Sequence, residues 1–365
     1  MKNFFFVYLV FRIGLTVYTL NLTPAYSWAG SSSTFTFYDQ FTYSGEKVNL
    51  QVEGTGEDAK LKLVNKWIKL NPPPEIPSER TYSPIAYDAQ NKKIILFGGF
   101  DVKDDLDLND TWVYNSYTQV PYWEEKKFLL NSPAARRQHT LVSIGNGQIL
   151  LFGGVNSQGV YFNDLWIYDV MNNSWNGIFP FGVVPSSRAL VSATFVPERN
   201  SVYFFGGYFG ETRFNETWEY QVNNSSWVKL TPLISPSNRD SAGMCYDFQQ
   251  QKIILFGGST GLPAPNNYLN DTWVYDASSN VWENRNPSFP GGILGKRATN
   301  IVYDKFNQKI VLFSGLGSSY ADTWFYDLKG NKWYEVHPSS SPSNRYGHSL
   351  VYVDFLDGVY LFAGG

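Results

Sequence analysis

The sequence predicts an all-β fold: a six-bladed β-propeller with four antiparallel strands in each blade, whose last blade is closed by strands from both ends of the chain. An apolar run ending in a glycine doublet, or a close variant of it, recurs six times in the 365 residues, and the phenylalanines of successive runs lie 49 to 57 residues apart. Repeats of this length are typical of propellers and other repeat architectures. No long segment shows the 3.6-residue hydrophobic period of a helix.

The first two runs of each repeat are short and β-prone, as expected of strands. The first follows a proline and an arginine, as in PSSR at 185–188 and PSNR at 236–239. The second ends in the doublet: IILFGG at 94–99, ILLFGG at 149–154, VYFFGG at 202–207, IILFGG at 253–258, IVLFSG at 310–315 and VYLFAGG at 359–365. Glycine permits backbone conformations and close approaches that a Cβ atom would block.

The third and fourth runs carry tryptophan, which can bury a large area between neighbouring blades. The third run is NDTWVYN at 109–115, NDLWIYD at 163–169, NETWEYQ at 215–221, NDTWVYD at 270–276 and ADTWFYD at 321–327. The fourth run holds one tryptophan in each repeat: Trp67, Trp123, Trp175, Trp227, Trp282 and Trp333.

The sequence has six doublets and six single tryptophans but only five runs of the third kind, which is accounted for if the last blade is shared between the chain ends. The alternative is a truncated reading frame with a lost third strand and a seventh blade. Its first two strands are predicted at about 347–353 and 359–363, and its fourth near Lys66–Leu70. The segment Ser33–Asp39 is the candidate third strand, which leaves residues 40–60 as an insertion. Closing the ring removes sheet edges that would otherwise invite aggregation.

The N-terminus resembles an export signal. Lys2 precedes the apolar run Phe4–Phe11, Arg12 interrupts it, and Ile13–Leu20 continues it toward small residues near Ser27. We expect a signal peptide over residues 1–27, followed by one propeller over 28–365 with repeats from about residue 64. The alternative is an N-terminal membrane anchor, because the apolar run approaches spanning length. The signal predicts a secreted, periplasmic or cell-surface protein with no membrane span after cleavage.

Composition excludes several classes of site. The formal net charge of −3 argues against a nucleic-acid partner, which requires a basic surface. A single cysteine, Cys245, excludes an intrachain disulfide, and three histidines leave few ligands for a transition metal. Because Cys245 falls at an inner-strand position, we expect it to be a packed core residue.

The doublets, the single tryptophans and the tyrosine of each third run together resemble the kelch-repeat family over about residues 64–365. The resemblance implies one propeller blade per repeat. It extends to the central domain of galactose oxidase, whose copper site uses two histidines and two tyrosines, one of them joined to cysteine. The Tyr-His dipeptide of that kind is absent from this sequence. We therefore expect no metal and no other cofactor.

A basic residue recurs before the first run of every repeat, where loops near the axis open on one face of a propeller. The candidate ligand-binding residues are Arg80, Arg137, Arg188, Arg239, Arg297 and Arg345, with Lys296 as the rival of Arg297. In one interpretation these side chains bind carbonyls or acids inside the ring. In the other they form a cationic rim that binds anionic glycans or acidic peptides.

Two further features have competing interpretations. The loop Asp101–Asp107 holds four aspartates, but it lacks the spacing of a calcium loop, so we expect a solvated acidic loop. Six asparagines are candidate glycosylation sites: Asn109, Asn172, Asn215, Asn223, Asn224 and Asn270. Three of them belong to the repeat itself, where asparagine can simply form the turn into the third strand.

The resulting expectation is a binding or interaction module for a protein or glycan ligand, rather than an enzyme. Two alternatives remain open: a sugar-modifying enzyme resembling sialic-acid epimerases, and a structural subunit of a surface assembly. The fold does not choose among them, because propellers host many functions.

Overall fold

The computed structural model describes residues 67–70, 75–118, 121–127, 131–262, 267–287, 294–317, 321–356 and 358–364. It also describes four strands nearer the N-terminus: β1 (Phe5–Leu9), β2 (Thr34–Phe37), β3 (Val48–Glu53) and β4 (Lys60–Leu63). The described residues are almost entirely strands and turns, with three short 3-10 helices at Pro197–Arg199, Val222–Asn224 and Asp354–Leu356.

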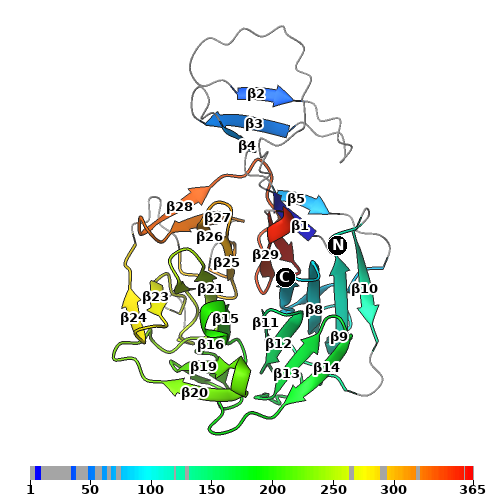
Figure 1. Cartoon of the computed structure of the whole chain (residues 1–365), viewed down its shortest axis with the longest axis vertical. Helices are drawn as coiled ribbons and strands as arrows, with labels where there is room; N and C mark the ends of the chain where they lie inside the picture. The colour runs from blue at the N-terminus through cyan, green and yellow to red at the C-terminus, as the bar shows by residue number, and fades with distance from the viewer. Residues whose placement is uncertain are drawn as a thin grey trace.

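Five blades are antiparallel sheets of four successive strands, as the repeat predicts (Figure 1). Blade 1 is β7 (Ile85–Asp88), β8 (Lys93–Asp101), β9 (Leu106–Asn115) and β10 (Tyr122–Lys126), and β6 (Arg80–Thr81) extends it. Blade 2 is β11 (Thr140–Ser143), β12 (Gln148–Phe152), β13 (Leu165–Asp169) and β14 (Ser174–Ile178). Blade 3 is β15 (Ser192–Val196), β16 (Ser201–Phe205), β19 (Thr217–Gln221) and β20 (Ser226–Leu230), with a small hairpin of β17 (Tyr208–Phe209) and β18 (Thr212–Arg213). Blade 4 is β21 (Gly243–Asp247), β22 (Lys252–Phe256), β23 (Thr272–Asp276) and β24 (Val281–Asn284). Blade 5 is β25 (Asn300–Asp304), β26 (Lys309–Phe313), β27 (Thr323–Asp327) and β28 (Lys332–Val336).

A further sheet, the terminal sheet, closes the ring with strands from both ends of the chain. Its order is β29 (Ser349–Val353), β30 (Gly358–Phe362), β1 and β5 (Trp67–Leu70). The inner strands touch in the order β7, β11, β15, β21, β25 and β29, and β29 returns to β7. The predicted number of six blades is therefore corrected to five blades of four consecutive strands. The terminal sheet closes the ring but differs from them, because it combines strands from both ends of the chain.

The predicted first, second and fourth strands of the terminal sheet are confirmed as β29, β30 and β5. The predicted third strand, Ser33–Asp39, is wrong: β1 lies between β30 and β5, and β2 pairs with β3 in a separate three-stranded sheet with β4. The register gives the reason, because Phe6 lies opposite Leu361 just as Trp324 of blade 5 lies opposite Leu312. Residues 3–8 thus follow the third-run pattern with phenylalanine in place of tryptophan. Most of the predicted signal peptide and part of the predicted insertion lie outside the described residues.

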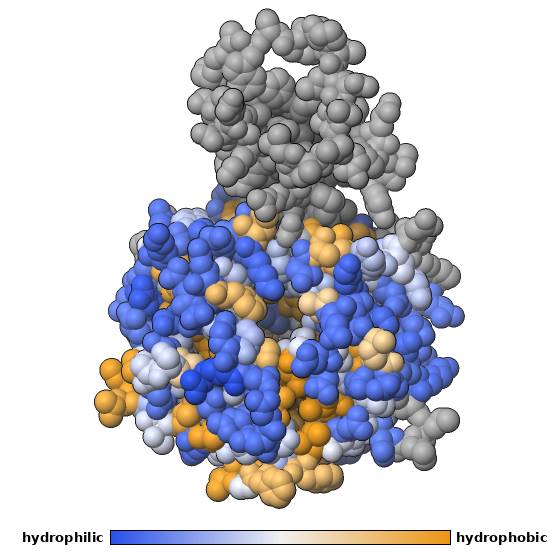
Figure 2. All heavy atoms as spheres, viewed as in Figure 1, coloured by the Kyte–Doolittle hydropathy of each residue, from blue (hydrophilic) through white to orange (hydrophobic). Residues whose placement is uncertain are grey.

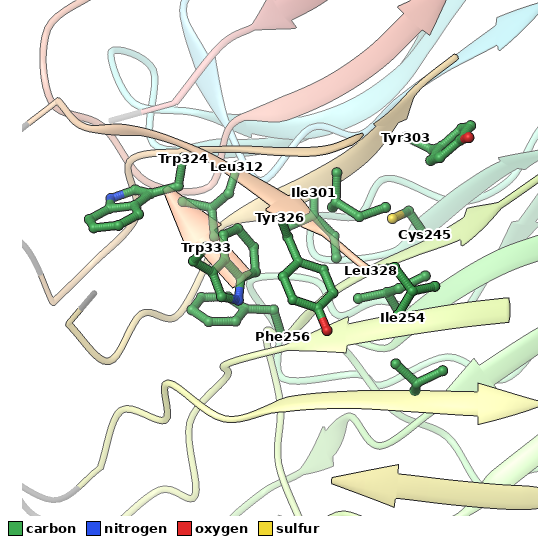
Figure 3. Close-up of a cluster of buried hydrophobic side chains, with 12 residues drawn as sticks. Cys245, Ile254, Phe256, Ile301, Tyr303, Leu312, Trp324, Tyr326, Leu328 and Trp333 are labelled. Atoms are coloured by element: carbon green, nitrogen blue, oxygen red, sulfur yellow. The ribbon is translucent and has the colours of Figure 1, made fainter. Parts of the chain in front are cut away.

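The core lies between blades rather than within one. Figure 3 shows one such cluster, where Ile254 and Phe256 of blade 4 pack against Leu312, Tyr326 and Trp333 of blade 5. Fourth-strand tryptophans also donate an indole N–H to a third-strand threonine of the preceding blade. The pairs are Trp175 with Thr111, Trp282 with Thr217, Trp333 with Thr272, and Trp67 with Thr323, at 3.0–3.2 Å. Since Trp67 makes this bond to blade 5, β5 occupies the outer position of the terminal sheet.

The glycine doublets allow close approach between blades. At Gly257, φ is +67° and an added Cβ would lie 2.7 Å from the carbonyl oxygen of Lys296. Ser314 and Ala363 take the first position of the doublet in blade 5 and the terminal sheet, with φ of 49° and 60°.

Candidate functional site

The basic side chain before each inner strand binds backbone carbonyls or a carboxylate of its own blade, and we call such a residue the bracket of that blade. Arg239 shows the arrangement: its Nε donates to the carbonyl of Ser237 and its Nη1 to that of Gly257, at 3.1 and 2.9 Å. Both terminal nitrogens also donate to the Asp271 carboxylate at 2.7 Å. The same charge pair recurs as Arg80 with Asp110, Arg136 with Asp164, Arg188 with Glu216 and Lys296 with Asp322.

These brackets correct the predicted cationic rim. Arg80, Arg188 and Arg239 are at most 3% exposed, because each guanidinium is enclosed by carbonyls and a carboxylate. In two blades the bracket is the preceding residue, Arg136 instead of Arg137 and Lys296 instead of Arg297. Arg345, half-buried, donates to the carbonyl of Ala363 in the terminal sheet. The buried members of the set therefore present no charge to a ligand at the surface.

The bracket in blade 3 shows how strongly the carboxylate is held. Burial would raise the pKa of Glu216, but hydrogen bonds from Lys229, Arg188 and Trp218 lower that pKa to about 2. Burial lowers the pKa of Arg188, and Glu216 opposes the shift. The repeated acid two residues before each third-run tryptophan is the signal that sequence reasoning missed.

Two residues beyond each bracket, the backbone forms a closed ring around the axis. Each of these six residues donates its backbone N–H to the carbonyl of its counterpart in the neighbouring blade, at 2.8–3.2 Å. The ring runs through Tyr82, Gln138, Leu190, Ser241, Ala298 and Gly347. All six have φ between 50° and 62°, the left-handed region that costs an L-residue free energy. Such strain often gathers at functional sites.

The ring opens into a central cavity of about 370 Å³, which is lined by the inner strands. Figure 2, seen down the same axis as Figure 1, shows the hollow at the centre of the molecule. His139 and His348 line it just below the ring, each with its ring edge-on to a phenylalanine of the preceding blade, Phe97 or Phe313. Burial lowers the pKa of both histidines, for His348 to about 3.

Three arginines lie near the ring on the loops that surround it. Arg137 pairs with Asp107 at 2.8 Å, and Arg213 pairs with Asp240 at 2.9 Å. Within the described part of the chain, no carboxylate pairs with Arg297, and its buried Nε has no hydrogen-bond partner.

Arg297 lies close to two tyrosines, Tyr268 and Tyr82. Its guanidinium lies 5.5 Å from the ring centre of Tyr268. Burial raises the pKa of Tyr82, and the positive charge of Arg297 opposes that shift. Tyr82 also packs against Tyr346, with ring centres 6.2 Å apart. The side of the mouth formed by blade 5 therefore offers a cation that no described carboxylate compensates, in an aromatic setting.

The remaining candidates lie elsewhere. Cys245 is a buried member of the cluster between blades 4 and 5, and burial raises the pKa of its thiol well above the usual value. Asp101 accepts backbone N–H groups of its own loop, and Asp107 belongs to the pair with Arg137. Among the described residues, no cluster of three or more potential metal ligands is found. The six sequon asparagines are all exposed, so their glycosylation stays a prediction.

Comparison with known proteins gives the family. The model of the KLHDC2/KLHL20/DRC7 Kelch-repeats domain matches residues 61–233 and 179–365. The chain is 26% identical over 237 residues to the flagellar outer-arm dynein alpha chain of Chlamydomonas reinhardtii, covering 59% of this chain and 5% of that protein. It is 28% identical over 275 residues to the leucine-zipper-like transcriptional regulator 1 homolog of Drosophila melanogaster, covering 69% and 26%. An F-box/kelch-repeat protein of Arabidopsis thaliana is 29% identical over 201 residues, covering 51% and 40%.

The chain thus spans no more than 40% of the length of each of these relatives. In the part of the chain that the structure describes, no helix is long and apolar enough to cross a membrane. The matched family model covers most of the sequence and agrees with the sheets described above, so the chain belongs to the kelch-repeat β-propeller family.

Proposed function

We propose that this propeller is an interaction module that binds a carboxylate-bearing segment of a partner protein at the ring end of its central cavity. One observation carries the proposal: Arg297 has no carboxylate partner among the described residues, whereas Arg137 and Arg213 beside the same ring each have one. A guanidinium group presents donors in a planar fork that matches a carboxylate. A ligand carboxylate would therefore supply the partner that the described residues do not provide.

The setting favours a protein ligand over a glycan as the source of the acid. Arg297 lies near the ring of Tyr268 and acts on the pKa of Tyr82, which packs against Tyr346, and tyrosine is enriched at protein interfaces. The proposal keeps the predicted preference for anionic ligands but moves it from six arginines to one. The ring of six inner strands, with the terminal sheet as its sixth member, is the scaffold that holds this mouth.

The test is an array of synthetic peptides in matched pairs, each acidic peptide beside its Asp→Asn and Glu→Gln analogue, probed with the full chain at low and moderate salt. Acidic peptides should bind and their amide analogues should not, with affinity falling as salt screens the charge. Arg297→Gln should weaken binding by about tenfold or more, the usual effect of losing a charged hydrogen bond.

Lys127→Gln is the matched control, because the Lys127 side chain lies just beyond the outer strand of blade 1 and is 82% exposed, with only the exposed Glu125 as its ion-pair partner at 3.9 Å among the described residues. Equal binding by both variants would refute the role of Arg297. Acid-dependent binding to sulfated or carboxylated glycans, with no peptide bound, would show that the partner class is wrong.

Export to a secreted, periplasmic or cell-surface location is a further part of the proposal. The apolar N-terminal run and the exposed sequon asparagines support it. The pairing of β1 with β30 and β5 opposes it, because cleavage after Ser27 would remove that strand. Intact mass of the protein isolated from its source decides: loss of residues 1–27, with or without glycan mass, supports export, and a retained N-terminus refutes cleavage.

A further inference from the structure

We infer that the partner segment carries a bulky aliphatic or aromatic side chain beside its carboxylate, and that this side chain docks on Val160, Tyr161 and Phe209, here called the apolar platform. The inference rests on the proposed function, because it describes the other half of the same ligand. It starts from an asymmetry of the mouth. Arg297, which has no carboxylate partner among the described residues, lies next to blade 5, whereas the apolar platform lies on the loops of blades 2 and 3.

The platform exposes apolar surface that the fold does not need to expose. Val160 is 48% and Phe209 is 51% exposed. Tyr161 follows Val160 in the chain and contacts blade 3, with its ring centre 4.9 Å from that of Phe209 and 5.5 Å from that of Tyr208. An exposed apolar patch beside a cavity mouth is typical of a binding surface.

The platform is also held rigidly. Tyr208 and Phe209 form strand β17, which pairs with β18, and the backbone of Tyr208 pairs with Ala189 next to the ring. The Tyr208 hydroxyl donates to the Gln138 side chain at 2.8 Å, which ties the hairpin to a ring residue. Tyr161 is fixed through its bridge to Val155. A surface ordered before binding loses little entropy when a ligand arrives.

The two halves of the site face one another across the ring. Gln138 of blade 2 and Ala298 of blade 5 are three steps apart in the six-membered hydrogen-bond ring, which makes them opposite members. Arg297 directly precedes Ala298, and Gln138 anchors the hairpin of the platform. A segment lying across the mouth therefore meets a cation at one side and apolar surface at the other.

The neighbours of the platform favour a protein segment over a lipid surface. The ion pairs Arg137–Asp107 and Arg213–Asp240 flank it, and Asp107 and Asp240 are already almost fully buried. Pressing these pairs into hydrocarbon would remove the remaining hydration of the arginines at a high cost in free energy. A peptide can instead place one side chain on the platform and leave the pairs at a polar rim.

The experiment is selection from a phage-displayed library of random heptapeptides on the full chain, followed by affinity measurements on synthetic copies of the selected peptides. The wild-type chain should enrich peptides that combine Asp or Glu with Leu, Ile, Phe or Trp. The double variant V160S/F209S should bind these peptides about tenfold or more weakly, the loss usual for truncating an interface hot spot. It should still prefer acidic peptides over their amide analogues.

The control is Phe181→Ser, which removes an apolar side chain that is 79% exposed on the outer loop between blades 2 and 3, where it lies beside Ser226. This variant should bind like the wild type. Selection of acidic peptides with no apolar preference, or equal weakening by the control, would overturn the inference and leave the proposed function standing. Failure to select any acid-dependent peptide would overturn both.

Discussion

Arg239 and Asp271 are 32 positions apart in the sequence, yet their side chains meet in two hydrogen bonds of 2.7 Å. The same guanidinium also binds the carbonyl of Gly257, and the same carboxylate accepts the indole N–H of Trp273. One ion pair thus joins the entry loop, the glycine doublet and the start of the third strand of blade 4. Because its counterparts occur in blades 1, 2, 3 and 5, this bracket is the repeating device that fixes one end of each blade.

Replacing the bracket of blade 4 should destabilise the protein. Arg239→Met should lower the free energy of unfolding by about 3 kcal/mol, the lower end of the range for breaking a buried pair. The lower end applies because the Asp271 side chain keeps 25% exposure and can be partly hydrated. Arg239→Lys should cost less, since Lys296 serves as the bracket of blade 5. Urea unfolding of the wild type and the two variants measures these free energies.

The matched control is Lys127→Met, which breaks an exposed pair with Glu125 and should change the free energy of unfolding by less than about 1 kcal/mol. Equal losses at Arg239 and Lys127 would contradict the bracket.

The architecture could be predicted because its determinants are local and repeat. Strand-forming runs, glycines at positions of positive φ and single tryptophans each recur at a fixed place in the repeat, and together they define the blades. The third strand of the terminal sheet could not be assigned in this way. In β1 phenylalanine stands in place of tryptophan, and the acid of the pattern is missing, so an apolar run at the N-terminus favoured an export signal instead.

The site was predicted only in part, since recurrence alone does not tell a bracket from a ligand-binding residue. Two blades have adjacent cations, Arg136 with Arg137 and Lys296 with Arg297, and only the positions of their acid partners show which one turns inward. The apolar platform had no signal in the repeat, because Val160 and Phe209 lie in loops that differ between blades. Long-range contacts, rather than local pattern, place these residues together at the mouth.

The terminal sheet should depend on β1 and not on the separate sheet of β2, β3 and β4. Deleting residues 1–10 removes the strand between β30 and β5, so it should lower the free energy of unfolding by several kcal/mol. Deleting residues 34–63 removes three strands that pair with one another, and it should change the stability of the propeller little. Thermal unfolding compares the two deletions, and a larger loss on deleting 34–63 would refute this assignment.

The two buried histidines should make stability depend on pH. Burial, aided by the charge of Arg345, lowers the pKa of His348 to about 3 from an ordinary 6.5. Between these values the unfolded chain binds a proton that the folded chain does not, so the stability present above pH 6.5 is lost as the pH falls toward 3. The pKa of His139 is also lowered, first by burial and then by Arg136.

Replacing both histidines with threonine, the residue that blade 5 has at this position, should therefore reduce the stability difference between pH 7 and pH 5. The loss of His348 alone should reduce it by about 1–2 kcal/mol, and the loss of His139 should act in the same direction. Packing losses are present at both pH values and cancel in that difference. Urea unfolding at the two pH values is the measurement, and His337→Thr, at an 81% exposed side chain, is the control. If the stability difference between pH 7 and pH 5 were the same in the double variant as in the wild type, the lowered pKa values of the two histidines would be refuted.

The hydrogen-bond ring stores backbone strain that one substitution can release. Ala298 is held at φ 50° between its bond to the Ser241 carbonyl and the bond it accepts from Gly347, which is already glycine at φ 62°. Ala298→Gly should raise the free energy of unfolding by about 0.5–1 kcal/mol, because relief of left-handed strain exceeds the added entropy of the unfolded chain. Ala89→Gly, in an exposed turn without positive φ, should give no such gain. Thermal unfolding distinguishes them: a loss of stability at Ala298 would mean that its methyl group packs more favourably in the ring than the left-handed backbone costs.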